Sequence, residues 1–258
     1  MKKFIFAVLF IIFCSTNSYA LRIVSLSPST TEILFKLGLG GDIVGDTLFS
    51  NYPEKAKKIT KVGSYIRPNL EKILELKPDY VIGMKEGMNK SVQNKLNELG
   101  IKNRFYASRN VSDIIYMIRD IAGIFHKNPN AVVAEIEKYY KKFPPAKKTG
   151  IFVVSVQPLI VATRNTFVNS ILRCAGIRNI VKDKALEFII IDKEYIIKKQ
   201  PDYIIVSLGV KKQIDMARSF IKRFHLKSKL LIVDPNIYNR PSYRIVNACL
   251  DLRKRTSY

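Results

Sequence analysis

Two distant stretches of the chain repeat one pattern: Glu71–Ile82, EKILELKPDYVI, and Glu194–Ile205, EYIIKKQPDYII. In each, a helix-forming run begins at a glutamate, and Pro-Asp-Tyr with a β-branched run begins seven residues after it. Proline cannot continue a helix and β-branched residues favour strands, so each stretch predicts a short helix followed by a buried strand. The pattern indicates a duplicated α/β unit.

Two further matches extend the duplication in the same order. Ile33-Leu34 with Gly38 corresponds to Ile171-Leu172 with Gly176, and Ile43-Val44-x-Asp46 corresponds to Ile180-Val181-x-Asp183. We therefore predict an α/β protein of two similar lobes with parallel central sheets. The predicted strands are Arg22–Leu26, Ile43–Val44, Tyr80–Ile82, Asn103–Ala107, Ile151–Ser155, Ile180–Val181, Tyr203–Ser207 and Leu230–Asp234. Ser29-Thr-Thr-Glu32 matches a capping box at the start of the first helix.

The segment between the two units is helical rather than rich in glycine and serine. Apolar residues recur at helical spacing in Ser112–Phe125 and in Asn128–Phe143, and Pro144-Pro145 ends the second stretch. We predict an N-terminal lobe over residues 21–127, a connecting helix over residues 128–148 and a C-terminal lobe over residues 149–258. Alternatively, both helices pack on one lobe.

The first twenty residues have the layout of a secretory signal peptide. A basic start, Met1-Lys2-Lys3, precedes ten apolar residues, and Ser18-Tyr19-Ala20 places small residues where a signal peptidase cleaves. Ten apolar residues are too few to cross a bilayer, which needs about 20. We predict that residues 1–20 are removed and that the mature chain is exported to the periplasm.

Cleavage leaves Cys174 and Cys249 as the cysteines of the mature chain. Two cysteines in an oxidising compartment most simply form one disulfide, and we predict that bond. The alternative is two buried free thiols packed as small apolar groups.

The composition is that of a globular protein, with 47% hydrophobic and 25% charged residues, and the formal net charge is +23. The sequence contains no phosphate loop, dinucleotide fingerprint, nucleophile elbow or metalloprotease helix, so we do not expect an enzyme or a resident cofactor. His126 and His225 lack partners in a metal-ligand pattern. Because the lysines and arginines are scattered along the chain, we expect solvated basic surfaces and no nucleic-acid partner. Attraction of an anionic ligand or of an acidic membrane is a weaker alternative.

The sequence resembles the periplasmic substrate-binding proteins of ABC importers for cobalamin, haem and iron-siderophores. The likeness is carried by Arg22-Ile-Val-Ser-Leu-Ser-Pro-Ser-Thr-Thr-Glu32, Lys77-Pro-Asp-Tyr-Val-Ile82, Ile171-Leu-Arg-Cys-Ala-Gly176 and Arg240-Pro-Ser-Tyr-Arg-Ile245. It covers essentially the whole mature chain and is strongest toward the cobalamin-binding members. The resemblance implies two α/β lobes that are joined by one long helix, with the ligand cleft lying between the lobes. It also implies a monomer that delivers a cobalamin, or another metal-bearing macrocycle or chelate, to an inner-membrane permease dimer.

The resemblance also implies a set of ligand-binding residues from both lobes. Phe49 falls where the cobalamin-binding member has Tyr, Tyr65 and Phe188 fall where it has Trp, and Met84 also replaces a Trp. In the matching cleft loop, Asn236 replaces an acidic residue and Arg240 is retained. The ligand-binding residues predicted in this way are Phe49, Tyr65, Phe188, Asn236, Ile237, Tyr238, Asn239 and Arg240. For each aromatic residue the alternative is core packing; for haem, Tyr65 is an available iron ligand.

Glu71 and Glu194 occupy the same place in the two duplicated units. The resemblance implies that these glutamates dock onto arginines of the two-fold permease. The alternative is that each is simply a carboxylate in the first turn of a helix, where the helix dipole favours it.

Overall fold

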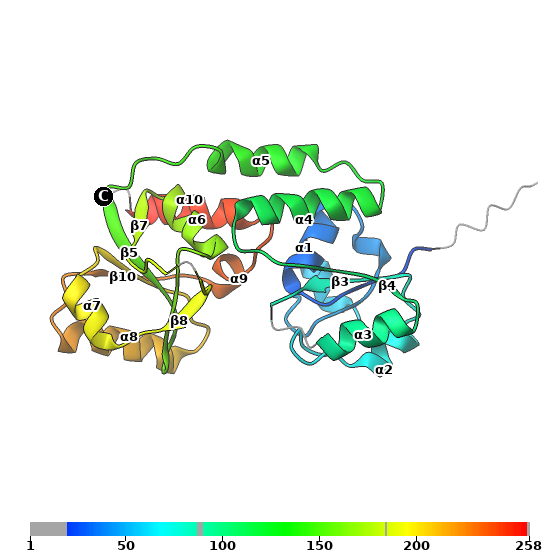
Figure 1. The fold of residues 1–258 in the computed structure, drawn as a ribbon, viewed down its shortest axis with the longest axis horizontal. Coiled ribbons are helices and arrows are strands. Elements are labelled where there is room, and N and C mark those ends of the chain that lie inside the picture. Colours follow the sequence, from blue (N-terminus) through cyan, green and yellow to red (C-terminus); the bar gives the residue numbers. More distant parts are fainter. Residues whose placement is uncertain (1–19, 87–89, 184, 257–258) are drawn as a thin grey trace, which may run out of the picture.

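The computed structural model describes residues 20–86, 90–183 and 185–256, which form two α/β lobes side by side (Figure 1). The predicted signal peptide, residues 1–20, lies outside the described residues except for Ala20. None of the described helices has both the length and the apolar character needed to cross a membrane.

The N-terminal lobe is built on a parallel sheet with the strand order β2-β1-β3-β4. Its strands are β1 (Ile23–Ser25), β2 (Ile43–Asp46), β3 (Tyr80–Met84) and β4 (Lys102–Tyr106). The inner strand β1 pairs with β2 on one side and β3 on the other, and Ile23 and Val24 are fully buried. Burial on both faces explains why these strands are continuous apolar runs in the sequence.

The helices of this lobe are α1 (Pro28–Lys36), η1 (Gly40–Asp42), η2 (Glu54–Lys58), α2 (Leu70–Glu75), α3 (Lys90–Glu98) and α4 (Val111–Ile124), of which η1 and η2 are 3₁₀ helices. The predicted capping box at Ser29 is wrong. Helix α1 begins at Pro28, and its N-cap is Ser27, whose side chain accepts a hydrogen bond from the Ser29 amide. Because proline is favoured in the first helical position, the helix starts earlier, and Glu32 is too far along it to reach back to the cap.

The C-terminal lobe contains a mixed sheet with the order β10-β9-β5-β6-β8, and β7 pairs with the first part of β5. Its strands are β5 (Lys148–Val156), β6 (Leu159–Ala162), β7 (Ile177–Asn179), β8 (Phe188–Ile190), β9 (Tyr203–Val206) and β10 (Lys229–Ile232). Strands β5, β9 and β10 are parallel, as predicted. Strand β7, which was not predicted, is also parallel to β5, whereas β6 and β8 are antiparallel additions. The strand predicted at Ile180–Val181 is wrong, because the Asn179 side chain accepts the Val181 amide and turns the chain there.

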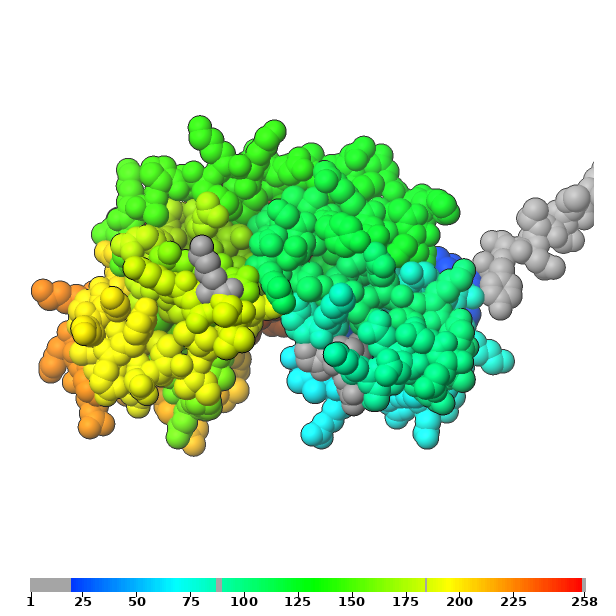
Figure 2. Space-filling view, in the orientation of Figure 1, coloured from blue at the N-terminus to red at the C-terminus, as the bar shows by residue number. Residues whose placement is uncertain are grey.

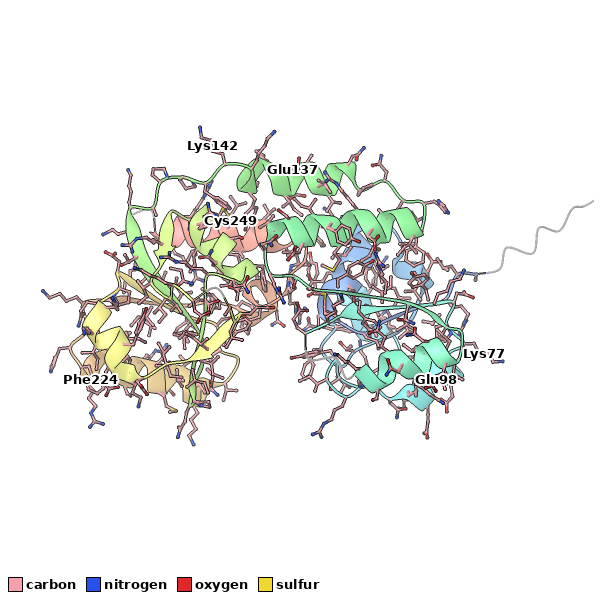
Figure 3. The ribbon with its side chains drawn as sticks, in the orientation of Figure 1. Lys77, Glu98, Glu137, Lys142, Phe224 and Cys249 are labelled. Atoms are coloured by element: carbon pink, nitrogen blue, oxygen red, sulfur yellow. A yellow bond between two sulfur atoms is a disulfide. The ribbon has the colours of Figure 1, made fainter. Side chains whose placement is uncertain are left out.

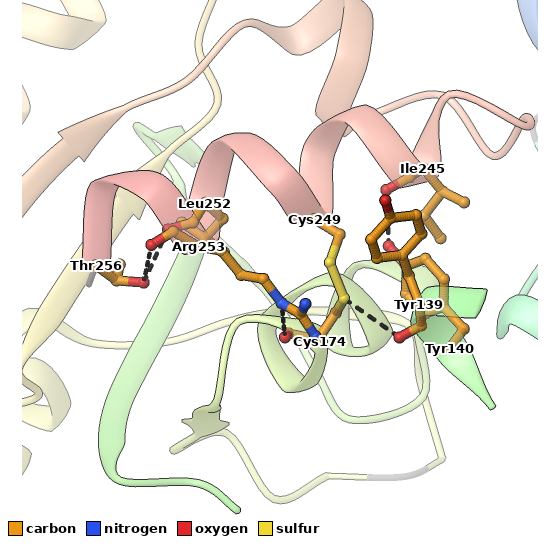
Figure 4. Close-up of a disulfide and its surroundings, with 8 residues drawn as sticks. All are labelled: Tyr139, Tyr140, Cys174, Ile245, Cys249, Leu252, Arg253 and Thr256. Carbon is orange, nitrogen blue, oxygen red and sulfur yellow. Dashed lines mark hydrogen bonds between the residues drawn. A yellow bond between two sulfur atoms is a disulfide. The ribbon is translucent and has the colours of Figure 1, made fainter. Parts of the chain in front are cut away.

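The helices of this lobe are α6 (Phe167–Cys174), α7 (Lys193–Lys199), α8 (Lys211–Arg223), α9 (Pro235–Tyr238) and α10 (Ile245–Thr256). Cys174 at the end of α6 is bonded to Cys249 in α10, so the predicted disulfide is confirmed in this structure (Figure 4). Both cysteines are fully buried, and Arg253 Nε donates to the Cys174 carbonyl 2.8 Å away. The bond fastens the last helix to the lobe.

Helix α5 (Asn130–Tyr140) connects the lobes and lies along one side of the molecule (Figure 1). It packs against α4 of the N-terminal lobe and against α6 and α10 of the C-terminal lobe. Its apolar face is inward: Ile136 is fully buried, whereas Glu137 projects outward (Figure 3). Tyr140 donates its hydroxyl to the Ile245 carbonyl, 2.7 Å away, at the start of α10. We therefore propose that the chain divides at this helix, between residues 21–127 and residues 149–258.

The duplicated Pro-Asp-Tyr motif performs the same structural task in both lobes. Asp79 precedes β3 and accepts the backbone amide of Arg22, at the start of the neighbouring β1, at 2.8 Å. Asp202 precedes β9 and accepts the backbone amide of Thr149, in the neighbouring β5, at 2.7 Å. Each aspartate thus satisfies a strand-end amide and fixes the start of two parallel strands.

Candidate ligand-binding cleft

A cleft of about 440 Å³ lies between the two lobes, on the side away from α5. Figure 2 shows the surface hollowed between the lobes at the lower edge of the view. The N-terminal lobe lines it with the start of α1, the loop after β2, the turn at Tyr65 and the end of β3. The C-terminal lobe lines it with the start of α6, the start of β8 and the segment around α9.

Phe49 lies in the loop after β2 and is 56% exposed at the cleft. Three buried hydroxyl groups hold this loop: Ser50 Oγ lies 2.9 Å from Thr47 Oγ1 and 3.1 Å from Thr31 Oγ1 of α1. Lys61 Nζ also donates to the Ser50 carbonyl. The ring is therefore presented to solvent by an anchored loop, and core packing does not account for it.

Tyr65 lies at the tip of a tight turn and is 36% exposed. The turn is closed by the bridge between Gly63 and Pro68, and Ser64 exchanges hydrogen bonds with Arg67. Gly63 has φ of +100°, and a Cβ there would lie 2.6 Å from the Arg67 carbonyl oxygen, so the turn requires glycine. The turn directs Tyr65 into the cleft opposite Phe188, which begins β8 and is 40% exposed.

The α9 segment divides into cleft residues and core residues. Asn236, Asn239 and Arg240 line the cleft. Tyr238 does not: its ring is 1% exposed and stacks on Phe152, and its hydroxyl donates to Asp251 at 2.8 Å. Ile237 packs against the same core. The prediction of ligand contact is therefore wrong for Tyr238, which is a core residue, and Ile237 lies outside the cleft lining. Residues three apart share one face of a helical turn, and here Asn236 and Asn239 form the face toward the cleft.

Arg240 is occupied by protein groups. Its Nη1 donates to Glu32 Oε1 at 3.0 Å and to Asn51 Oδ1 at 2.9 Å, and its Nη2 donates to the Phe49 carbonyl at 2.9 Å and to Asn236 Oδ1 at 2.6 Å. A guanidinium has five donors, of which these bonds use four. Arg240 thus lies in the cleft wall with little capacity left for a ligand.

Two carboxylates that sequence reasoning missed also line the cleft, one from each lobe. Glu86 follows β3; its Oε1 accepts the Ser108 amide at 2.9 Å, and its buried Oε2 has no hydrogen-bond partner among the residues that the structure describes. Glu187 precedes β8, and its Oε1 lies 3.4 Å from Nε of Arg109 in the other lobe. Burial and the neighbouring Glu86 raise the pKa of Glu187. Neither glutamate belongs to a duplicated motif, so no sequence signal singled it out.

The duplication could have located one further pair of cleft elements. It aligns Ser29 at the start of α1 with Phe167 at the start of α6, and both line the cleft. The two helices therefore present equivalent N-termini to the same space, one polar and one apolar.

Glu71 and Glu194 lie away from the cleft wall, in the first turns of α2 and α7. Both are exposed, and no partner for either side chain is found within the described residues. The helices belong to different lobes, and both lie below α4 and α5 in Figure 1. In the described part of the chain, no group of three or more potential metal-ligating side chains is found.

Comparison with known proteins agrees with this architecture. A family model described as "Periplasmic binding protein" matches residues 23–230. A vitamin B12-binding protein of Yersinia pestis (strain Pestoides F) is 29% identical over 241 residues, which are 90% of this chain and 84% of that protein.

Two solved structures are similar in fold. The periplasmic vitamin B12-binding protein of Vibrio cholerae matches with a TM-score of 0.72 at 23% identity, covering 90% of this chain and 95% of that one. A periplasmic haem-binding protein from Pseudomonas aeruginosa matches with a TM-score of 0.77 at 20% identity, covering 91% of both chains. One fold therefore serves different ligands in these structures.

Proposed function

We propose that this chain, which belongs to the periplasmic binding protein family, captures a corrinoid such as cobalamin and delivers it to the permease of an ABC importer. The observation that carries the proposal is the cleft with exposed aromatic rings on both walls: Phe49 and Tyr65 from one lobe, Phe188 from the other. Covering such rings with a flat macrocycle is worth about 25 cal/mol per Å² of apolar surface removed from water.

The charged groups of the cleft favour a corrinoid over an anionic ligand. Glu86 and Glu187 offer acceptor oxygens, while the Nη donors of Arg240 are occupied. The side-chain amides at the edge of a corrin ring carry N–H groups that can donate hydrogen bonds to these carboxylates. The propionates of haem, or an anionic ferric chelate, would face like charges, which costs binding energy.

A haem- or ferric-siderophore-binding protein of the same class is the alternative. Tyr65 supports it, because a phenolate can ligate iron and the ring lies in the cleft. The haem-binding structures that the chain resembles are 19% to 24% identical to it, and the solved vitamin B12-binding protein is 23% identical, so these likenesses bear on the fold and do not separate the two ligands.

We further propose that the protein acts in the periplasm after removal of residues 1–20 and that it catalyses no reaction. The layout of those residues and the family of the chain support export. Capture and delivery need a cleft and a docking face, and Glu71 and Glu194 are our candidates for the docking face.

The deciding experiment is calorimetric titration of the protein with cyanocobalamin, haemin and a ferric catecholate. We expect saturable one-to-one binding of cyanocobalamin. Glu86→Gln with Glu187→Gln is the matched test of the charge argument, since it should weaken cyanocobalamin binding and improve haemin binding. Binding of haemin alone, lost in Tyr65→Phe, would establish the alternative.

A further inference from the structure

The buried carboxylate of Glu32 joins the two lobes beside the cleft. Glu32 lies on α1 of the N-terminal lobe and is fully buried. Its Oε1 accepts Arg240 Nη1 at 3.0 Å and Arg244 Nη1 at 3.1 Å, and its Oε2 accepts the Ser242 hydroxyl. All three donors follow α9 in the C-terminal lobe.

The same cluster reaches the ligand-facing residues of both walls. Arg240 holds the carbonyl of Phe49 and the side chain of Asn51 in the N-terminal lobe, and the side chain of Asn236 in its own lobe. Arg244 lies over the ring of Tyr52, with 3.8 Å between its guanidinium carbon and the ring centroid. The position of the Phe49 loop is thus tied to the position of α9.

The energetics favour one arrangement of the lobes. Removing one partner from a buried ion pair is strongly destabilising, because the remaining charge is left without compensation. Any relative movement of the lobes that separates α1 from α9 would leave the buried carboxylate of Glu32 without its cationic partners or would expose it to water. The exposed pair Arg109–Glu187 also bridges the lobes, but its side chains retain solvent contact and such pairs contribute little.

We propose that Glu32 is the positioning residue of the cleft, and that it fixes the spacing of the aromatic walls by gathering Arg240, Ser242 and Arg244 onto α1. Arg240 then acts on the ligand through Phe49 and Asn236 rather than by direct contact. The effect on ligand affinity rests on the proposed function, whereas the effect on the spacing of the lobes does not.

The test measures the distance between the lobes in the ligand-free protein and, separately, affinity for cyanocobalamin. Spin labels are placed at Asn94→Cys on α3 and Lys222→Cys on α8, near Glu98 and Phe224 in Figure 3. The buried disulfide is left oxidised. We compare Glu32→Gln and Arg240→Lys with Arg109→Gln, which breaks the exposed pair and leaves the buried cluster intact.

We expect a narrow distance distribution in the parent and in Arg109→Gln, and a broad or shifted one in Glu32→Gln and Arg240→Lys. The same two variants should bind cyanocobalamin at least tenfold more weakly. If Glu32→Gln does not fold, Arg240→Lys still decides the question, because it keeps a cation for Glu32 but cannot reach the four acceptors. An unchanged distribution of the inter-lobe distance in Arg240→Lys overturns the proposal. If that variant keeps the distance distribution but loses affinity for cyanocobalamin, Arg240 contacts the ligand directly. A parent that does not bind cyanocobalamin would reject the proposed ligand and leave the distance result standing.

Discussion

The two lobes share their sheet-forming motifs and differ in the elements that line the cleft between them. Asp79 and Asp202 occupy the same place and accept equivalent strand-end amides. The N-terminal wall of the cleft carries its rings on a loop and a turn, whereas the C-terminal wall carries Phe188 on the edge strand β8, which has no counterpart in the other lobe. The duplicated aspartates therefore help to build both lobes, whereas the aromatic rings Phe49, Tyr65 and Phe188 of the cleft lining lie outside the duplicated motifs.

The largest expected difference between the lobes comes from the disulfide. It closes a segment of 75 residues within the C-terminal lobe, and losing such a crosslink typically costs about 2–5 kcal/mol. We expect Cys174→Ala with Cys249→Ala to lower protection from hydrogen exchange in β9 and to leave β3 nearly unchanged. Equal losses in β3 and β9 would mean that the lobes unfold as one unit.

The paired aspartates should differ in strength. Asp202 accepts both the amide and the hydroxyl of Thr149 and pairs with Lys148, whereas Asp79 accepts the Arg22 amide. Each substitution by alanine leaves a strand-end amide without its partner, at about 1–3 kcal/mol. Urea denaturation should show the larger loss for Asp202→Ala. An equal or greater loss for Asp79→Ala would contradict the ranking.

The same contacts make the Asp202 contribution depend on pH. The hydrogen bonds from Thr149 lower the pKa of Asp202 in the folded protein. Because the pKa of Asp202 is lower in the folded than in the unfolded protein, ionised Asp202 stabilises the fold at pH values above the ordinary aspartate pKa of about 3.9. This stabilisation is lost as the pH falls through the pKa of the folded state. The difference in unfolding free energy between the parent and Asp202→Asn should therefore be full at pH 7 and shrink on acidification. A difference independent of pH down to pH 2 would exclude the charged hydrogen bond as its source.

The aromatic walls should contribute to affinity from both lobes. Because Tyr65 and Phe188 are exposed at the cleft, replacing either with alanine should weaken cyanocobalamin binding by at least about 1 kcal/mol and change stability by less than about 0.5 kcal/mol. Tyr116→Ala is the control, since Tyr116 is 54% exposed but lies on α4 outside the cleft lining. Unchanged affinity with lost stability in Tyr65→Ala would make that ring a structural residue.

The smallest effect on the protein itself is expected at Glu71 and Glu194. Both carboxylates are exposed in the first turns of short helices, so Glu71→Ala and Glu194→Ala should leave stability and ligand affinity nearly unchanged. We expect each to slow docking to the permease, and the double variant to slow it more than either one, because rim charges steer association and fix register. Measurement requires the permease in nanodiscs. Impaired ligand binding with normal docking would reverse the assignment.

Local patterns predicted the sheets better than the cleft. The strands β3 and β9 are buried on both faces, and each follows the duplicated Pro-Asp-Tyr motif as an apolar run that is visible in the sequence. Strands β6 and β8, four and three residues long, are also apolar, but they lie outside the duplicated motifs and were not predicted. The role of Glu32 could not be predicted, because its partner Arg240 lies 208 residues away and a local motif offered a simpler explanation. For Tyr238 the sequence predicted a ligand contact where the structure has a core residue. A match to a family's cleft loop does not determine which side of a helical turn the ring occupies.

The 208 residues that separate Glu32 from Arg240 along the chain have a consequence for how the molecule is assembled. The chain supplies the carboxylate of Glu32 near its beginning and the guanidinium groups of Arg240 and Arg244 near its end. Helix α10, which follows them, is fastened to α6 by the disulfide and to α5 by the Tyr140 hydroxyl. Until those last residues are in place, the N-terminal lobe has an acidic group with nothing to neutralise it. The two lobes can therefore be joined at this cluster only after Arg240 and Arg244 have been added to the chain, and we expect a product truncated before Arg240 to leave Glu32 without these partners.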